Sequence, residues 1–256
     1  EVAPEDVESH GRLEPGKMFL VDMNQGRIIN DEEIKSKIVK ERPYQKWLDK
    51  TRLHLKDIPY TGETCPIELL DIKTRQRLFN YTFEDIQEVI TPMAQKAKEA
   101  LGSMGIDTPL AVLSNKPQLI SNYFKQLFAQ VTNPPLDGIR EEIVTDISLS
   151  LGKDRNIFSI TERQCRKLKI QNPVISNDDL EKIRHISVEG FKTETIEMLY
   201  QKEKGLNGLE DALENIIIQI EKALENKTNI IILSDRGVSK EMAPIPSLLA
   251  CSFVNH

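Results

Sequence analysis

Cysteine and long apolar runs are scarce in this sequence, and each scarcity excludes a class of protein. Cysteine occurs only three times in 256 residues, at Cys65, Cys165 and Cys251. These cysteines lie far apart and form no CxxC pair, so the sequence indicates neither a zinc ribbon nor a disulfide framework. No stretch approaches the roughly 18 apolar residues that a membrane-spanning helix requires. We therefore expect no membrane span, and a reducing compartment.

Positive charge is also in the minority. The chain has 34 Lys and Arg against 40 Asp and Glu, which gives a net charge of −6. A nucleic-acid-binding surface is usually basic, so we expect no nucleic-acid partner. A chain of this length can bury about 70–75% of the surface that its unfolded form exposes. One large domain or two small ones can therefore form without disulfides.

The two ends of the sequence indicate a segment of something longer. The first residue is Glu1 rather than Met, and no signal peptide follows it. The last residues, PSLLACSFVNH (246–256), form an apolar run that stops without a helix-capping residue. We expect this chain to be a piece of a larger polypeptide or a processed product.

The N-terminal quarter predicts a hairpin and two helices. Short apolar runs at Lys17–Asp22 and Arg27–Ile29 surround a turn-like Met-Asn-Gln-Gly. Asp31 then begins a helix whose acidic first turn suits the helix dipole. A second helix is predicted over Tyr44–Leu55. The turn-rich stretch Lys56–Pro66 is expected to link this first subregion to the rest of the chain.

The middle of the chain predicts a capped helix, a strand and another helix. Thr82 and Asp85 have the spacing of a capping box before a helical pattern of apolar residues. Pro109–Leu113 (PLAVL) is short, apolar and bounded by turn signals, which predicts a buried strand. Apolar residues at helical spacing predict a helix over Leu119–Phe128, which runs directly into the sequence VTNPP at 131–135.

The C-terminal third gives the fold class. Phe191–Leu199 and Asn229–Leu233 have strand character, and Pro244–Ala250 predicts the start of a helix. One face of a long helix between the two strands is traced by Leu209, Leu213, Ile216, Ile217, Ile220 and Leu224. Alternating strands and helices are typical of parallel β/α units, so we predict an α/β fold. Ligands gather at the C-terminal ends of parallel strands, and here that position is Ser234–Val238.

Two glycine-containing turns are candidate sites. After the second strand, Asp235 and Arg236 could bind a phosphate or a carboxylate; alternatively, Asp235 caps the next helix and Gly237 forms a tight turn. Leu101–Asp107 (LGSMGID) could form an anion-binding nest of backbone N–H groups, or a neutral turn. No Walker lysine follows this second turn, so a nucleotide site has little support.

Histidines and the VTNPP corner complete the candidates. The four histidines are His10, His54, His185 and His256, and no two have metal-ligand spacing. His185 ends the helical pattern NDDLEKIRH, where a cation suits the helix dipole. In the corner, Pro134 and Pro135 exclude helix, while Thr132 and Asn133 offer uncharged donors and acceptors on a stiff backbone. The corner is either a structural joint or the wall of a site.

Long blocks of the sequence identify a family resemblance. The chain closely resembles the large subunit of glutamate synthase in the blocks LEPGKMFLVDMNQGRIINDEEIK (13–35), YTFEDIQEVITPMA (81–94), SMGIDTPLAVLSNKP (103–117), YFKQLFAQVTNPPLDGIREE (123–142), ILSDRGV (232–238) and APIPSLLACSFVNH (243–256). The resemblance implies that residues 1–60 are a linker and the start of the central domain, following an absent amidotransferase domain. Residues 61–256 would be the central domain, truncated at its C-terminal end. That domain is, in this family, an incomplete, rudimentary barrel related to the TIM-like FMN domain but lacking the flavin.

The resemblance also implies a role. Glutamate synthase makes two glutamates from glutamine and 2-oxoglutarate, and ammonia passes between its two reaction centres through a tunnel. By resemblance, Thr132 and Met104 border that tunnel, and Asn133 belongs to the same wall. The FMN and the 3Fe-4S cluster belong to the full-length enzyme, so the segment alone is expected to be inert, with no catalytic, cofactor-binding or metal-binding residue.

Partners and compartment follow from the same resemblance. We expect the amidotransferase and FMN domains of the same polypeptide as partners. The expected electron donor is ferredoxin, with an NAD(P)H-oxidising small subunit as the alternative. A richness in Ile, Lys and Asn favours a plastid stroma or a bacterial cytoplasm. A second reading stays open: a stand-alone, non-catalytic binding or regulatory module of the same fold.

Overall fold

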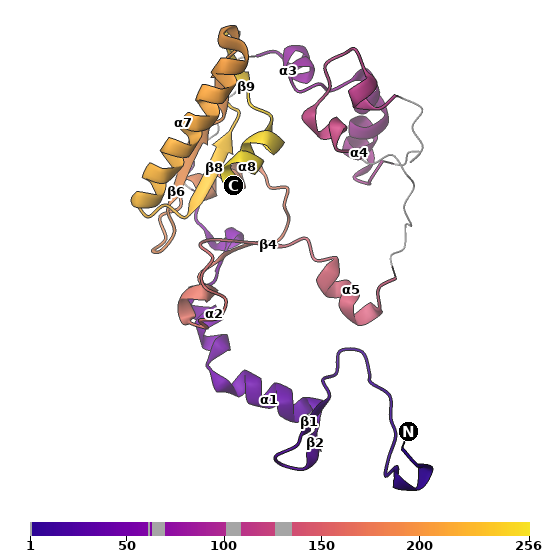
Figure 1. Cartoon of the computed structure of the whole chain (residues 1–256). Helices are drawn as coiled ribbons and strands as arrows, with labels where there is room; N and C mark the ends of the chain where they lie inside the picture. Colours follow the sequence, from indigo (N-terminus) through magenta and orange to yellow (C-terminus); the bar gives the residue numbers. More distant parts are fainter. Residues whose placement is uncertain (1, 61, 63–69, 101–108, 126–134) are drawn as a thin grey trace. The chain divides into compact units, whose positions relative to one another are not determined.

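The computed structural model describes residues 2–60, 62, 70–100, 109–125 and 135–256. The chain forms two compact units, the first from residues 1–58 and 133–175 and the second from residues 59–132 and 176–256. Figure 1 shows the helices and strands of both. Within the described residues, no helix is both long and apolar enough to cross a membrane.

The predicted N-terminal hairpin and first helix are present in unit 1. β1 (Leu20–Asp22) pairs antiparallel with β2 (Arg27–Ile29). α1 (Asp31–Glu41) follows directly, and the side chain of Asn30 caps it by accepting a hydrogen bond from the amide of Glu33. Acidic residues occupy the first turn of α1, as the helix dipole favours. These predictions are confirmed.

Unit 1 also contains a small three-stranded sheet. β3 (Leu53–His54) runs parallel to the central strand β5 (Leu168–Ile170), and β4 (Leu149–Leu151) runs antiparallel to β5 on its other side. The buried side chains of this core are Leu55, Ile58, Leu168 and Ile170. Two short helices, α2 (Tyr44–Thr51) and α5 (Gly138–Val144), belong to the same unit.

The second predicted helix is shorter than expected. It was predicted to reach Leu55 but ends at Thr51, whose hydroxyl bonds back to the carbonyl of Trp47 at 2.7 Å. The amide of Leu53 donates to the carbonyl of Lys167 at 3.0 Å, so this part of the chain pairs with β5. A sheet contact with a residue more than a hundred positions away overrides the local helical pattern.

Residues 70–100, in the first half of unit 2, are mainly helical and largely exposed. α3 (Ile72–Leu78) begins at an aspartate cap. The predicted capping box is confirmed, because Asp85 accepts from the amide of Thr82 at 2.8 Å and the Thr82 hydroxyl accepts from the amide of Asp85 at 3.1 Å. The helix that follows starts as a π-helical stretch over Asp85–Ile90 and continues as α4 (Thr91–Lys96).

Two predictions for the middle of the chain are wrong. Instead of a buried strand at Pro109–Leu113, the structure has a 3-10 turn over Ala111–Leu113, with Val112 71% exposed and Leu113 72% exposed. Residues 126–128 of the helix predicted over Leu119–Phe128 lie outside the described residues; in its described part, a 3-10 turn spans Ile120–Tyr123 and Phe124 is exposed. Both segments satisfy their backbone locally through i to i+3 hydrogen bonds, because no described strand lies beside them.

The second half of unit 2 contains the predicted parallel β/α unit. β6 (Thr193–Glu197) is joined by α7 (Gly205–Glu225) to β8 (Ile230–Ser234), and the two strands pair in parallel. α7 covers one face of this pair in Figure 1. The larger barrel to which such a unit could belong stays a prediction.

Four further elements border this unit. α6 (Asn177–Arg184) precedes it, while β7 (Leu199–Gln201) pairs antiparallel with β9 (Met242–Pro244). α8 (Ser247–Asn255) follows β9. The helix predicted from Pro244 therefore starts three residues later, because Pro244 belongs to a strand that the sequence pattern did not indicate.

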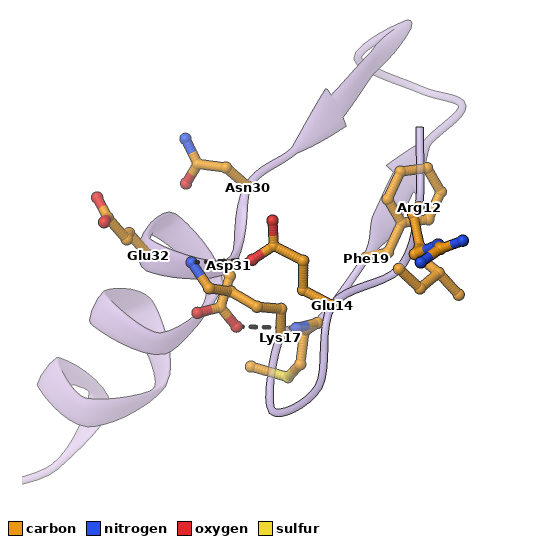
Figure 2. A pocket seen from close by; sticks show the side chains of 9 residues that line it. Arg12, Glu14, Lys17, Phe19, Asn30, Asp31 and Glu32 are labelled. Atoms are coloured by element: carbon orange, nitrogen blue, oxygen red, sulfur yellow. Dashed lines mark hydrogen bonds and ion pairs between the residues drawn. The ribbon is translucent and has the colours of Figure 1, made fainter. Parts of the chain in front are cut away.

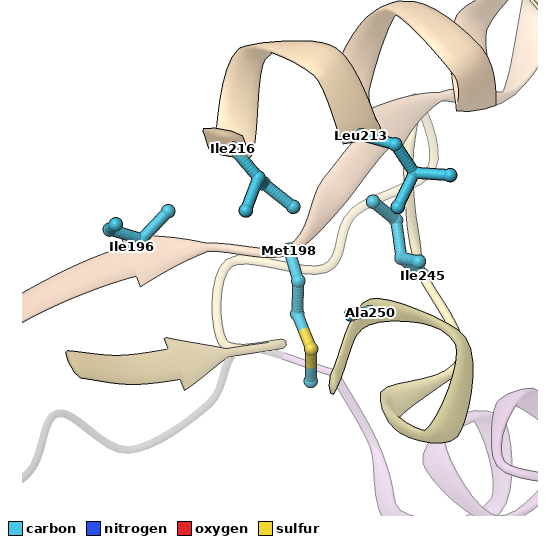
Figure 3. Close-up of a cluster of buried hydrophobic side chains, with 6 residues drawn as sticks. All are labelled: Ile196, Met198, Leu213, Ile216, Ile245 and Ala250. Atoms are coloured by element: carbon cyan, nitrogen blue, oxygen red, sulfur yellow. The ribbon is translucent and has the colours of Figure 1, made fainter. Parts of the chain in front are cut away.

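The core of unit 2 lies between α7, the strands and α8. Figure 3 shows its six buried residues, which are Ile196, Met198, Leu213, Ile216, Ile245 and Ala250. The predicted apolar face of α7 is confirmed at Leu213 and Ile216, which are 8% and 1% exposed, while Leu224 near the helix end is exposed. Each large apolar side chain buried in this way stabilises the fold by roughly 1.5–3 kcal/mol.

Candidate functional site

The predicted tunnel wall falls on chain that the structure does not describe, and its residues are Met104, Thr132 and Asn133. The description resumes at Pro135, two residues before Asp137. The Asp137 carboxylate caps α5 by accepting from the amides of Ile139 and Arg140, at 3.1 and 3.0 Å. The corner therefore leads directly into a well-capped helix start. The LGSMGID turn also lies outside the described residues.

The turn after β8 is a tight turn built around Gly237. Gly237 has a φ of +95°, and a Cβ atom there would lie 3.3 Å from Cδ1 of Leu199 and 3.9 Å from Oε1 of Glu197. The predicted role of Asp235 as a helix cap is wrong, because the next element is β9 rather than a helix. The predicted tight turn at Gly237 is confirmed by its positive φ, which only glycine adopts without strain.

Arg236 is held at the carboxyl ends of the parallel strands. Its guanidinium Nη2 donates to Oδ1 of Asn177 at 3.2 Å, and its backbone amide donates to the hydroxyl of Ser234 at 3.3 Å. Asp178 and Asp179 follow in the first turn of α6, where Asp179 pairs with Nζ of Lys182 at 2.8 Å. The arrangement connects the turn to α6, and the phosphate or carboxylate role of Arg236 stays a prediction.

His185 takes the helix-end position that its sequence predicts. It is the C-terminal cap of α6, and its Nε2 lies 3.4 Å from the Glu181 carboxylate, one helical turn earlier. Glu181 is only 5% exposed and also pairs with Nε of Arg184 at 3.2 Å. Sequence reasoning missed this buried carboxylate, although the spacing of Glu181 to Arg184 and His185 matches helical neighbours. Among the described residues, no three His, Cys, Asp or Glu side chains are grouped to hold a metal ion.

An open hollow of about 430 Å³ lies between residues 12–19 and the start of α1 (Figure 2). Asp31 organises it, because one carboxylate oxygen accepts from the amide of Met18 at 2.8 Å and the other pairs with Nζ of Lys35 at 2.8 Å. These bonds, that of Lys35 above all, hold the pKa of Asp31 below its usual value. Lys35 also donates to the carbonyl of Gly16 at 2.9 Å. Both oxygens of Asp31 thus hold the chain before β1 against the start of α1. We therefore interpret the hollow as a structural feature and not as a binding site.

Comparisons with known proteins assign both parts of the chain. Residues 74–256 match the family described as glutamate synthase central domain, and residues 1–47 match class-II glutamine amidotransferases. The glutamate synthase [NADPH] large chain of Bacillus subtilis is 43% identical over 98% of this chain and 16% of its own length. Glutamate synthase [NADH] of Schizosaccharomyces pombe is 36% identical over the whole chain and 13% of its own length. Ferredoxin-dependent glutamate synthase 2 of Synechocystis is 34% identical over 98% of this chain and 16% of its own length.

The matched relatives are much longer than this chain, which spans between 13% and 16% of the three just named. The central-domain match nevertheless covers residues 74–256, well over half of the present sequence. The resemblance inferred from the sequence blocks is therefore confirmed, and the chain belongs to the glutamate synthase central domain family.

Proposed function

We propose that this chain joins the amidotransferase and FMN domains of a glutamate synthase and contributes to the wall of its ammonia tunnel. The observation that carries the proposal is the order of the two family matches on one chain. An amidotransferase match ends at residue 47 and a central-domain match begins at residue 74. A segment that contains the junction of two modules is suited to link them, and this supports the role of linker.

The chemistry of the tunnel residues fits transport of a neutral molecule. Glutamine hydrolysis releases ammonia, which condenses with the carbonyl of 2-oxoglutarate, loses water and gives an imine that two electrons and two protons reduce to glutamate. FMN supplies the hydride in the full-length enzyme. Thr132 and Met104 present a hydroxyl and a thioether, and neither group can hold ammonium as a carboxylate would. Asn133 has an uncharged amide side chain, which fits the same role.

The cofactors are proposed to lie outside this segment. Iron–sulfur clusters are held by several cysteine thiolates, whereas Cys65, Cys165 and Cys251 are separated by at least 86 positions in the sequence. No glycine-rich phosphate-binding motif of a nucleotide fold is present either. We also infer that β6, α7 and β8 are part of the rudimentary barrel, and their parallel pairing supports this.

The electron donor and the compartment stay predictions. We expected ferredoxin, but the relatives are named for NADPH, NADH and ferredoxin, and the NADPH-named relative has the highest identity of the three quoted. Relatives come from bacteria, from yeasts and, in rice, from a chloroplastic enzyme. Assaying the full-length enzyme with each reductant in turn decides the donor.

The tunnel role is tested by Thr132→Trp in the full-length enzyme. If Thr132 borders the conduit, the variant still hydrolyses glutamine and still makes glutamate from 2-oxoglutarate and added ammonia. Glutamate made from glutamine falls, and ammonia accumulates in solution. The control is Leu206→Trp, because Leu206 is 69% exposed in unit 2 and should tolerate a larger side chain. Loss of both half-reactions together with stability would instead indicate overpacking, which costs about 1–3 kcal/mol.

A further inference from the structure

The helices α1 and α2 follow each other in the sequence but are held by different partners. α1 ends at Glu41 and α2 begins at Tyr44, so only Arg42 and Pro43 separate them. Figure 1 shows them as two separate helices. The residues that hold each helix show to which part of the molecule it belongs.

α1 is held by the hairpin and by the chain before it. Arg27 makes a bidentate ion pair with Glu33, with nitrogen–oxygen distances of 2.6 and 2.8 Å. Lys35 donates to the carbonyl of Gly16 at 2.9 Å, and Ile29 of β2 is 8% exposed. All of these residues precede Arg42, so α1 and the hairpin form one body.

α2 is held by chain much later in the sequence. Nζ of Lys50 lies 2.8 Å from Oε1 of Glu162, and β3, which follows α2, pairs in parallel with β5. Leu55 and Leu168, in the core of this sheet, are 8% and 0% exposed. Glu162 and Leu168 belong to the range matched to the central domain. α2 and β3 therefore pack as part of that domain, although neither family match covers residues 48–73.

The turn between the two helices is stiff. Pro43 has φ −81° and ψ 58°, and the amide of Tyr44 donates to the carbonyl of Arg42 at 2.9 Å, which makes an inverse γ-turn. The proline ring restricts φ, and the carbonyl of Pro43 accepts the first hydrogen bond of α2 from the amide of Trp47 at 3.1 Å. The guanidinium of Arg42 donates to the carbonyl of Ile160 at 2.7 Å. A turn bonded in this way is a rigid elbow and not a loose linker.

We propose that the Arg42–Pro43 turn is the joint that positions the amidotransferase part of the polypeptide on the central domain, and that residues 44–58 are built into the central domain. This inference rests on the proposed function, since it requires an amidotransferase domain on the same chain. It differs from the family matches, because the amidotransferase match runs on to residue 47, inside α2. A stiff joint keeps the two reaction centres in one orientation, so that ammonia passes between them without loss.

Hydrogen exchange of the full-length enzyme, followed by mass spectrometry, locates the joint. Leu168→Ala empties a fully buried position in β5 and should speed exchange of residues 44–54 by about tenfold or more, while residues 31–41 exchange as in the wild type. Ile29→Ala is the matched variant on the other side of the joint. It should speed exchange of residues 31–41 and leave residues 44–54 unchanged.

The pattern of exchange decides the position of the joint. If each variant speeds exchange of both helices alike, or if α2 responds to Ile29→Ala and α1 to Leu168→Ala, the joint does not lie at Pro43 and the inference is overturned. Leu168→Val is a milder change at the same position and provides the same comparison if Leu168→Ala does not fold.

Pro43→Gly tests whether the stiffness of the joint matters. Glycine frees the φ angle that proline restricts. We expect the variant to keep both half-reactions but to pass less of the amide nitrogen of glutamine into glutamate, and to release more ammonia into solution. Pro173→Gly is the control, because Pro173 is an exposed proline in the loop after β5.

Unchanged transfer of nitrogen in a stable Pro43→Gly enzyme would overturn the positioning role. This proposal and the tunnel role fail independently. If Thr132→Trp leaves transfer intact, Thr132 does not border the tunnel, whereas the exchange pattern of α1 and α2 still locates the joint.

Discussion

Two apolar runs of similar length adopt different structures in this protein: one forms a packed strand and the other an exposed 3-10 turn. Asn229–Leu233 (NIIIL) supplies most of β8, whose side chains are buried or half-buried. Pro109–Leu113 (PLAVL) has the same pattern of a short apolar run bounded by turn signals, yet Val112 and Leu113 are more than two-thirds exposed. The difference is that β8 pairs with β6 and is covered by neighbouring helices, whereas the second run has no described strand beside it.

This comparison shows what an apolar run needs in order to become a strand. Backbone groups in a strand are satisfied only by a neighbouring strand, whereas a 3-10 turn satisfies them locally. The apolar side chains of a run favour its burial, but they do not provide the neighbouring strand that its backbone needs. The partner of β8 is β6, a strand nearly 40 residues earlier, and the long helix α7 lies between the two strands in the sequence.

The largest effect is expected in the packed core. Ile216→Ala removes a side chain that is 1% exposed among Ile196, Met198 and Leu213, and should lower the free energy of unfolding by about 2–5 kcal/mol. Amide hydrogen exchange of β8 measures this loss. Ile218→Ala on the same helix is the control, because Ile218 is 48% exposed. Equal losses for the two variants would contradict the assignment of the core.

A second, smaller effect is expected in the turn after β8. Gly237→Ala places a Cβ at a φ of +95° and 3.3 Å from Leu199, so it should cost about 1–3 kcal/mol. Gly26→Ala is the matched control, because Gly26 also has a positive φ, +62°, but no heavy atom lies within 4 Å of its added Cβ. The exchange rate of β6 and β8 amides reports the change. A loss no greater than that of Gly26→Ala would show that Leu199 accommodates the methyl group.

A pH effect is expected in the N-terminal segment. The bonds from Lys35 and Met18 lower the folded-state pKa of Asp31, so its carboxylate stabilises the fold above the unfolded pKa, which is about 3.9. That contribution is lost as the pH falls through the lower folded-state pKa. Asp31→Asn should therefore destabilise the hairpin and α1 at neutral pH, with a difference from wild type that disappears in acid.

The measurement for Asp31 is a pH series of hydrogen exchange for residues 18–35. Glu32→Gln serves as its control, since it removes a neighbouring charge that bonds neither Lys35 nor the Met18 amide. A difference between Asp31→Asn and wild type that grows toward acid would contradict the sign of this prediction.

The smallest effect is expected in the exposed run. Val112→Ala should change the free energy of unfolding by no more than about 0.5 kcal/mol, because Val112 is 71% exposed. Chemical denaturation of the full-length enzyme, followed by exchange in unit 2, checks this value. A loss as large as that of Ile216→Ala would show that Val112 is buried in the whole enzyme.

Local signals predicted local structure well. The capping pair Thr82 and Asp85, the hairpin before Asp31 and the face of α7 all depend on residues close in sequence, and they are confirmed except at Leu224, which is exposed. The sequence missed features that depend on distant chain. β3 exists because Leu53 pairs with Leu168, and Glu181 is buried in a helix that packs against β6. The tunnel residues came from resemblance alone, since a threonine two residues before a pair of prolines has no chemistry that distinguishes the wall of a tunnel from a structural joint.

The most direct test of the tunnel role follows the nitrogen atom. Full-length enzyme is given glutamine labelled with nitrogen-15 at its amide, together with excess unlabelled ammonium, and the label in the newly formed glutamate is measured. If Thr132 borders the conduit, the wild-type product keeps the label, whereas Thr132→Trp mixes its ammonia with solution and loses most of it. Label retained in a stable, active Thr132→Trp enzyme would contradict the account and remove Thr132 from the tunnel wall.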